Sequence, residues 1–103
     1  LVIGSGNITH NLREMNRAEP DGEGHDWVVE FADWVADALV YGPVSDLIDW
    51  ENTAPHARRS HPSDEHFLPL FTALGAGGPD ASVERIHSSY SYGSLAMDMY
   101  SFF

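Results

Sequence analysis

The chain has 103 residues, of which 43% are hydrophobic and 12% aromatic, so it can bury one core but not two. Sixteen acidic and five basic residues give a net charge of −11, which argues against nucleic acid or an anionic membrane surface as a partner, because both are bound mainly through clustered Lys and Arg. Without Cys, neither a disulfide framework nor a thiolate metal site can form, so any metal must use His, carboxylate or carbonyl ligands in what we expect to be a cytoplasmic protein.

The start of the chain predicts a buried strand that leads into a loop. Residues 1–3 are apolar, and Gly4, Ser5, Gly6 and Asn7 follow as a turn that brings the chain to His10. Because a protein seldom begins inside a central strand, we expect a truncated or proteolysed piece of a longer chain. The polar stretch 16–24, with one proline and two glycines, predicts a surface loop.

An amphipathic helix is predicted from residue 26 to about residue 41. Apolar residues recur there at spacings of three and four, namely Trp27, Phe31, Trp34, Ala38 and Tyr41. Asp26 lies near the positive N-terminal end of this helix, and Gly42-Pro43 ends it. We expect the apolar stripe to face the core.

The next third of the chain predicts two shorter helices. Residues 44–51 form the first, with Leu47, Ile48 and Trp50 turned inward, and residues 52–62 follow as an irregular loop. Ser63 is a preferred N-cap residue, so the second helix should run from there to about residue 74, where glycines end it. Pro69 would lie inside that helix and kink it.

Two strands are predicted for the remainder of the chain. Residues 82–90 and 94–102 flank Gly93, and the second run alternates in the manner of a half-buried strand. They form either a hairpin or two edges of one larger sheet.

Two histidines carry the candidate chemistry. His10 follows a strand and a glycine-containing loop, in the run Gly6-Asn7-Ile8-Thr9-His10-Asn11-Leu12-Arg13. His66 lies roughly fifty residues later, in the run Pro62-Ser63-Asp64-Glu65-His66-Phe67-Leu68-Pro69-Leu70. Taken alone, each is most simply a hydrogen-bonding or solvated histidine. The even spacing of His56, His61 and His66 invites a zinc cluster, but residues five apart do not share a helix face and Pro62 interrupts any helix.

Together, and in this order, the two runs resemble the C-terminal half of the class III extradiol ring-opening dioxygenases, in the DOPA-dioxygenase-type branch of the LigB-like family. The run from Tyr90 to Met97 also resembles the closing strands of that family. The resemblance implies that His10 is the catalytic acid/base and that His66 is a ligand of Fe(II), with zinc as a metal that a given preparation could hold instead. His61, Asn11 and Arg13 are then candidates for substrate binding, although the scarce arginines of an acidic chain more often form salt bridges.

The resemblance also implies a fold and a missing N-terminal half. We expect an α/β fold in three layers, a mixed central sheet flanked by helices, of which residues 1–103 are the C-terminal part of a single catalytic domain. Family members carry two further histidine ligands in an N-terminal half, in a Gly-His-Gly-Ser-Pro-like turn and a Ser-Ala-His-Trp-like strand end, and neither motif occurs here. The chain alone should therefore be inactive, and we expect it to associate with the missing half or with another copy of itself.

The function that follows is a nonhaem Fe(II) extradiol dioxygenase, which opens a catechol-type ring with O2. Two alternatives remain open. One is a noncatalytic acidic module for binding or assembly, and the other is a zinc-dependent hydrolase with His10 as base and His66 as ligand.

Overall fold

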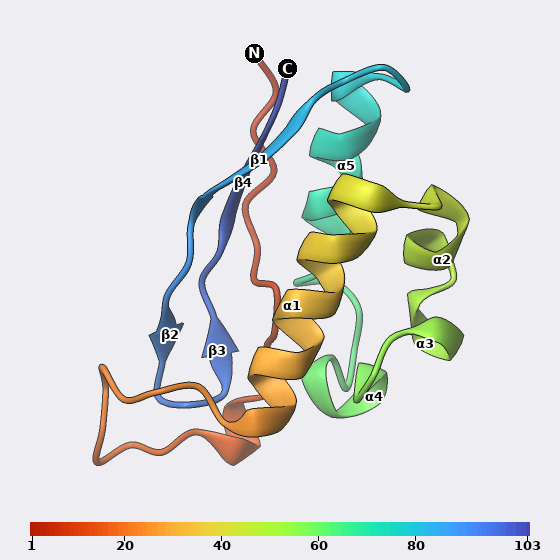
Figure 1. Ribbon diagram of the computed structural model, residues 1–103. Helices are drawn as coiled ribbons and strands as arrows, with labels where there is room; N and C mark the ends of the chain where they lie inside the picture. The colour runs from red at the N-terminus through yellow and green to blue at the C-terminus, as the bar shows by residue number, and fades with distance from the viewer.

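Five helices lie on one side of a long antiparallel hairpin in the computed structural model, which describes residues 1–103 (Figure 1). The N-terminal segment runs extended between the hairpin and the helices, and the two termini lie side by side. The fold is a helical layer against a narrow β-layer. The α/β class expected from the sequence is confirmed, with two two-stranded antiparallel sheets in the chain.

The predicted long helix is confirmed as α1 (Asp26–Tyr41), which ends at Gly42, where φ is 66° and the N–H donates to the Ala38 carbonyl. Its buried face differs from the predicted stripe. The buried residues are Trp27, Val28, Phe31, Ala32, Val35 and Leu39, whereas Tyr41 is exposed and Trp34 only half-buried. The buried Val28, Ala32, Val35 and Leu39 also recur at spacings of three and four, but each lies one residue after a predicted position.

The segment after α1 breaks into three short helices. The single helix expected over 44–51 is two, α2 (Val44–Ile48) and α3 (Trp50–Thr53), separated at Asp49. The Thr53 hydroxyl donates to the carbonyls of Asp46 and Asp49 at 2.6 and 2.9 Å, which holds α3 folded back on α2. Leu47 and Trp50 are buried as expected, but Ile48 is exposed, because the break turns it outward. The expected irregular loop also contains a helix, α4 (Ala57–Ser60).

The fifth helix, α5 (Leu68–Gly77), begins four residues later than predicted, with Phe67 in place of Ser63 as its N-cap, and ends at Gly78, where φ is 85°. The Ser63 hydroxyl donates to the Glu65 carboxylate at 3.0 Å instead of capping a helix. Pro69 therefore lies in the first turn of α5, where its missing N–H breaks no hydrogen bond, so the predicted kink is wrong. As a consequence, His66 lies in the turn before α5 and not in the helix.

The C-terminal strands form a hairpin within this chain, which is one of the two arrangements that the sequence left open. β1 (Val83–His87) pairs with β4 (Met99–Phe102), and β2 (Tyr90–Ser91) pairs with β3 (Leu95–Ala96). The β1–β4 ladder contains an irregularity between Arg85 and His87. The Arg85 guanidinium donates to Asp98 at 2.6 Å and to Asp33 of α1 at 3.4 Å, which ties the hairpin to the helical layer.

The predicted strand at residues 1–3 is wrong, because these residues are extended and exposed but pair with no neighbouring strand. The first backbone hydrogen bonds of this segment are from Asn7 N–H to the His66 carbonyl, at 2.8 Å, and from Ile8 N–H to the Ala96 carbonyl, at 3.1 Å. A run of apolar residues favours a buried strand, but a strand also needs a neighbouring strand to pair with.

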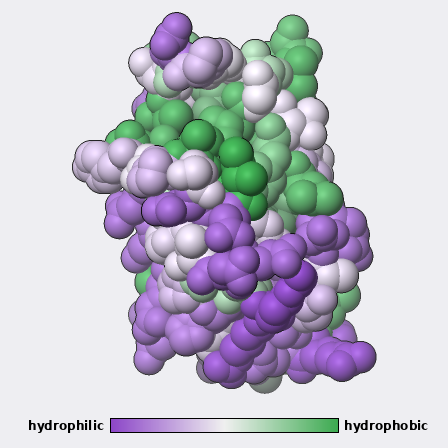
Figure 2. Space-filling view, turned by 90° about the vertical axis from the view of Figure 1, so that its right-hand side faces the viewer, coloured by the Kyte–Doolittle hydropathy of each residue, from purple (hydrophilic) through white to green (hydrophobic).

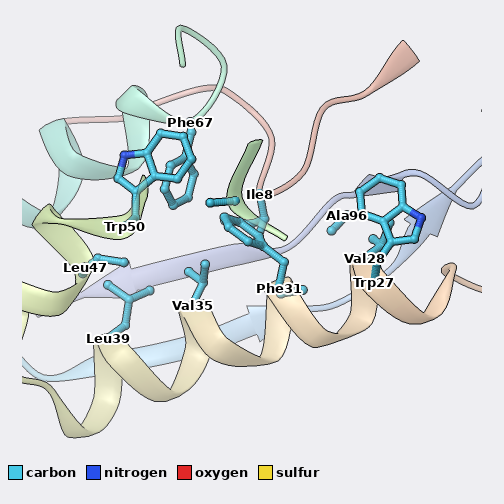
Figure 3. Close-up of a cluster of buried hydrophobic side chains, with 12 residues drawn as sticks. Ile8, Trp27, Val28, Phe31, Val35, Leu39, Leu47, Trp50, Phe67 and Ala96 are labelled. Atoms are coloured by element: carbon cyan, nitrogen blue, oxygen red, sulfur yellow. The ribbon is translucent and has the colours of Figure 1, made fainter. Parts of the chain in front are cut away.

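The core lies between α1 and the short helices. Figure 3 shows Phe31, Val35 and Leu39 on the side of α1 that faces Leu47, Trp50 and Phe67. Phe31, Trp50 and Phe67 meet edge to face, with ring centroids 5.1 to 6.4 Å apart. This aromatic cluster supports the turn that carries His66. No helix of the chain has the length and apolar character that crossing a membrane requires.

Candidate active site

The rings of His10 and His66 are stacked, with centroids 3.6 Å apart and planes inclined by 20°. The two side chains come from segments that are far apart in the sequence, the N-terminal segment and the turn before α5. Both are partly exposed, with 42% of the His66 side chain open to solvent. The structure thus brings together the two residues that the sequence singled out.

The backbone at His10 and just before it is held by hydrogen bonds. The Asn7 N–H donates to the carbonyl of His66 itself, and the His10 N–H donates to the Ser60 carbonyl, each at 2.8 Å. A Cβ at Gly6 would lie 2.2 Å from the His66 carbonyl oxygen, so the close approach of the two segments requires glycine there. The spacing of the two imidazoles is therefore set by the backbone.

Two buried hydroxyls complete this support. The Thr9 hydroxyl donates to the Ser94 carbonyl at 2.9 Å and accepts from the Ala96 N–H at 2.7 Å. The Ser94 hydroxyl donates to the Asn11 carbonyl at 2.8 Å. Sequence reasoning missed Thr9 and Ser94 as supporting residues, and the only signal for them was that each lies inside a segment of the family resemblance.

The three candidate substrate-binding residues are placed differently. Asn11 is buried, and its side chain donates to the Arg59 carbonyl at 2.7 Å and accepts from the Arg13 N–H at 3.1 Å. Arg13 is exposed and forms no ion pair, whereas Arg59 pairs with Glu14 at 2.6 Å. Asn11 is therefore occupied within the protein, and the guanidinium of Arg13 remains open to a ligand.

His61 has no exposed surface and lies among the rings of Phe31, Trp50 and Phe67. Its Nε2 donates to the Ile8 carbonyl at 2.6 Å, and its ring stacks on Phe67 with centroids 4.8 Å apart. Burial lowers the pKa of His61 to about 4, so the ring is neutral at neutral pH. Its position favours a supporting role over direct contact with a substrate.

The buried His61 predicts a pH dependence of stability. Its pKa is about 4 in the folded chain and 6.5 ordinarily, so the unfolded chain binds the proton more readily. Stability should therefore fall as the pH drops through 6.5 toward 4, by about 2 kcal/mol between pH 7 and pH 5. We expect urea titrations of wild type and of His61→Gln, which cannot titrate, to diverge by this amount. Parallel loss of stability in both would contradict the assignment, since the carboxylates are common to them.

Burial lowers the pKa of His10, and the neighbouring His66 lowers it further. Both effects favour the unprotonated ring, which can accept a proton. The Glu65 carboxylate opposes them and lies 3.8 Å from the His66 Nε2, beyond hydrogen-bond distance. An imidazole of this kind is suited to moving a proton near neutral pH.

A cavity of about 810 Å³ opens beside His66. It lies between the N-terminal segment, α5 and the strand segment from Met97 to Phe102, and its walls are largely apolar. His10 is not among its lining residues, so the cavity meets the histidine pair through His66. A second apolar cavity, of about 630 Å³ between α1, α2 and α5, contains none of the candidate residues.

The chain does not assemble the zinc cluster that the spacing of its histidines suggested. His56 pairs with Glu30 at 2.6 Å on the surface, and His61 is enclosed in the core. No group of three His, Cys, Asp or Glu side chains could hold a metal ion. His66 is suited to be one ligand, because it is accessible and no hydrogen bond of the chain occupies its ring nitrogens. A set of three protein ligands would need at least one from outside residues 1–103.

Comparison with known proteins shows the family of the chain. The family described as the catalytic LigB subunit of aromatic ring-opening dioxygenase matches residues 1–102. The chain is 36% identical over 103 residues to a 4,5-DOPA dioxygenase extradiol of Beta vulgaris and 37% identical to that of Portulaca grandiflora, covering 99% of this chain and 37% of each relative. The protein of the same name from Escherichia coli K12 is 30% identical.

A solved structure extends the likeness to the fold. The crystal structure of the uncharacterized protein JW3007 from Escherichia coli K12 has a TM-score of 0.74 and 30% identity, over 91% of this chain and 39% of that one. The chain thus spans little more than a third of the relatives it matches. On the family match, the relatives and the shared fold, the chain belongs to the LigB family of extradiol ring-opening dioxygenases, in its DOPA-dioxygenase-type branch.

Proposed function

We propose that this chain is part of a nonhaem Fe(II) extradiol dioxygenase that opens a catechol-type ring. The observation that carries the proposal is the stacking of His10 on His66, with ring centroids 3.6 Å apart. It places the proton-accepting imidazole of His10 beside the imidazole of His66, whose ring nitrogens form no hydrogen bond. Family membership supplies the reaction class, since the relatives are named as extradiol dioxygenases of DOPA.

In this proposal His66 is one protein ligand of the metal. Three facial ligands leave open positions for substrate and O2, and the other two would come from the portion of the relatives that this chain does not cover. Bound Fe(II) would supply the redox chemistry that lets O2 react with the ring. Both oxygen atoms enter the product, and the ring C–C bond beside the diol breaks to leave an aldehyde and a carboxylic acid.

The proposed work of His10 is to move protons. Its imidazole would accept a proton from a catechol hydroxyl and return one as the ring opens, which is a task that general acid/base catalysis assigns to a positioned side chain. The backbone bonds from Asn7 and His10 keep the ring in place for this without the help of the metal. Arg13, exposed and without an ion-pair partner, is the proposed contact for a substrate carboxylate.

The test is oxygen uptake by the full-length protein, meaning the longest polypeptide that its gene encodes. After anaerobic loading with Fe(II), catechol substrates should consume one O2 per ring opened and produce the absorbance of a semialdehyde. The zinc-hydrolase alternative predicts cleavage of esters or amides by the zinc-loaded protein, with no oxygen consumed. Absence of oxygen uptake with every catechol tried would overturn the proposal.

The apolar surface of the chain predicts association. Figure 2 shows hydrophobic side chains gathered in the upper part of the face that α2 and its neighbours form, and Val44 and Ile48 of α2 are exposed. Patches of this kind commonly mark interfaces. We expect the isolated 103-residue chain to form dimers or larger species at micromolar concentration in sedimentation experiments.

A pair of variants locates that association. Ile48→Glu should shift the chain toward monomer. Leu12→Glu also replaces an exposed aliphatic side chain by a carboxylate, at a position outside α2, and should have a smaller effect. A wild-type chain that sediments as a monomer at tens of micromolar would contradict the prediction.

A further inference from the structure

His61 is a buried imidazole in an aromatic environment that could also accommodate a phenyl ring. The His61 side chain is enclosed by Phe31, Trp50 and Phe67, with ring centroids 4.8 to 5.7 Å away. Enclosing a polar ring costs free energy unless it is hydrogen-bonded, and its Nδ1 has no partner. The Nε2 of this ring must therefore contribute something that an apolar residue could not.

That contribution is a hydrogen bond to the segment that carries His10. The Nε2–H donates to the Ile8 carbonyl at 2.6 Å, and this carbonyl has no other hydrogen-bond partner in the chain. Two residues further on, the His10 N–H donates to the carbonyl of Ser60, the residue before His61. The two bonds together clamp residues 8–10 against residues 60–61.

The same ring also contacts the segment that carries His66. Phe67, the next residue, is fully buried and stacks on His61 with planes inclined by 25°. His61 therefore touches the carbonyl two residues before His10 on one side and the residue after His66 on the other.

We infer that His61 is a positioning residue, which fixes the position of the His10 ring relative to the His66 ring through its hydrogen bond to the Ile8 carbonyl. It neither binds substrate nor holds metal, because it is fully buried and is absent from the walls of the cavity beside His66. The kinetic part of this inference rests on the proposed function. The geometric part does not.

Two substitutions separate the hydrogen bond from the packing. His61→Phe keeps the aromatic stack on Phe67 but leaves the Ile8 carbonyl buried without a donor. His61→Gln places an amide N–H near the position of Nε2 and can restore the bond. Val35→Ala, a cavity in the core face of α1, serves as a control for a general loss of stability.

In the full-length protein, His61→Phe should lower kcat roughly 10- to 100-fold, because a misplacement on the order of 1 Å is enough for such a loss. The KM for catechol and the iron content should stay within about twofold of wild type, since the residues beside substrate and metal are untouched. His61→Gln should recover most of the lost kcat, and Val35→Ala should leave kcat near that of wild type.

A second readout does not depend on turnover. In ¹⁵N-labelled metal-free protein, His61 should be the Nε2–H tautomer with a proton protected from exchange, and proton contacts between the His10 and His66 rings should weaken in His61→Phe and return in His61→Gln. If wild type consumes no oxygen but the ring contacts behave this way, the proposed function fails and the positioning role stands. Ring contacts unchanged in His61→Phe would overturn the role, and so would a kcat loss that glutamine does not restore or that Val35→Ala reproduces.

Discussion

Replacing His10 by alanine should abolish most of the ring-opening activity without emptying the metal site. A residue that only moves protons can be removed while the ligands stay, so the full-length His10→Ala protein should retain iron and bind catechol. Its turnover should fall by roughly 100- to 10,000-fold, the range expected for loss of a general acid/base. Oxygen uptake measured alongside iron content decides the result.

His10→Gln sharpens this experiment. Glutamine can donate a hydrogen bond but cannot exchange a proton near neutral pH, so it should restore little activity. Loss of iron from His10→Ala would mean that the residue is a ligand, and normal turnover would mean that the resemblance around residues 7–13 misleads.

Replacing His66 by alanine should instead weaken metal binding. With one of three facial ligands gone, the affinity of the full-length protein for iron should fall by roughly 10- to 100-fold or more. The accessible ring nitrogens of His66, which no hydrogen bond of the chain occupies, are the structural reason. Metal titration of the purified variant measures the effect.

His56→Ala is the matched control, because it removes another exposed histidine whose Nε2 is engaged with Glu30. It should leave the iron affinity unchanged. Unaltered affinity in His66→Ala, or an equal loss in both variants, would rule out His66 as the specific ligand.

Local sequence patterns were enough to predict the elements that depend on contacts between residues close together in the sequence. The helix of α1 follows from its apolar recurrence and from Gly42. The two C-terminal strands follow from the pattern around Gly93, which has a φ of 74°, but the sequence left open whether they pair as a hairpin. The start of α5 was misplaced because Ser63 is a good cap in principle, yet its hydroxyl bonds to Glu65. Residues 1–3 failed as a strand for a different reason, since pairing is decided by what lies beside a segment and not by its own composition.

The same division applies to the candidate site. His10 and His66 were found by resemblance, and no spacing rule would have predicted that their rings stack. Nor could sequence reasoning separate His61 from a substrate contact, because burial against Phe67 and a bond to the Ile8 carbonyl exist only after folding. Their roles in catalysis and metal binding stay predictions that the variants above decide.

The hydrogen bonds that link Ile8 and Thr9 to Ala96 and Ser94 join an earlier part of the chain to a part that is synthesised much later. Contacts of such long sequence separation form late, since the loop between them must close first. While residues 94–96 are still unmade on the ribosome, the segment bearing His10 lacks these bonds. The backbone around His10 therefore gains its full set of hydrogen bonds only after the hairpin has been made, 85 or more residues later in synthesis.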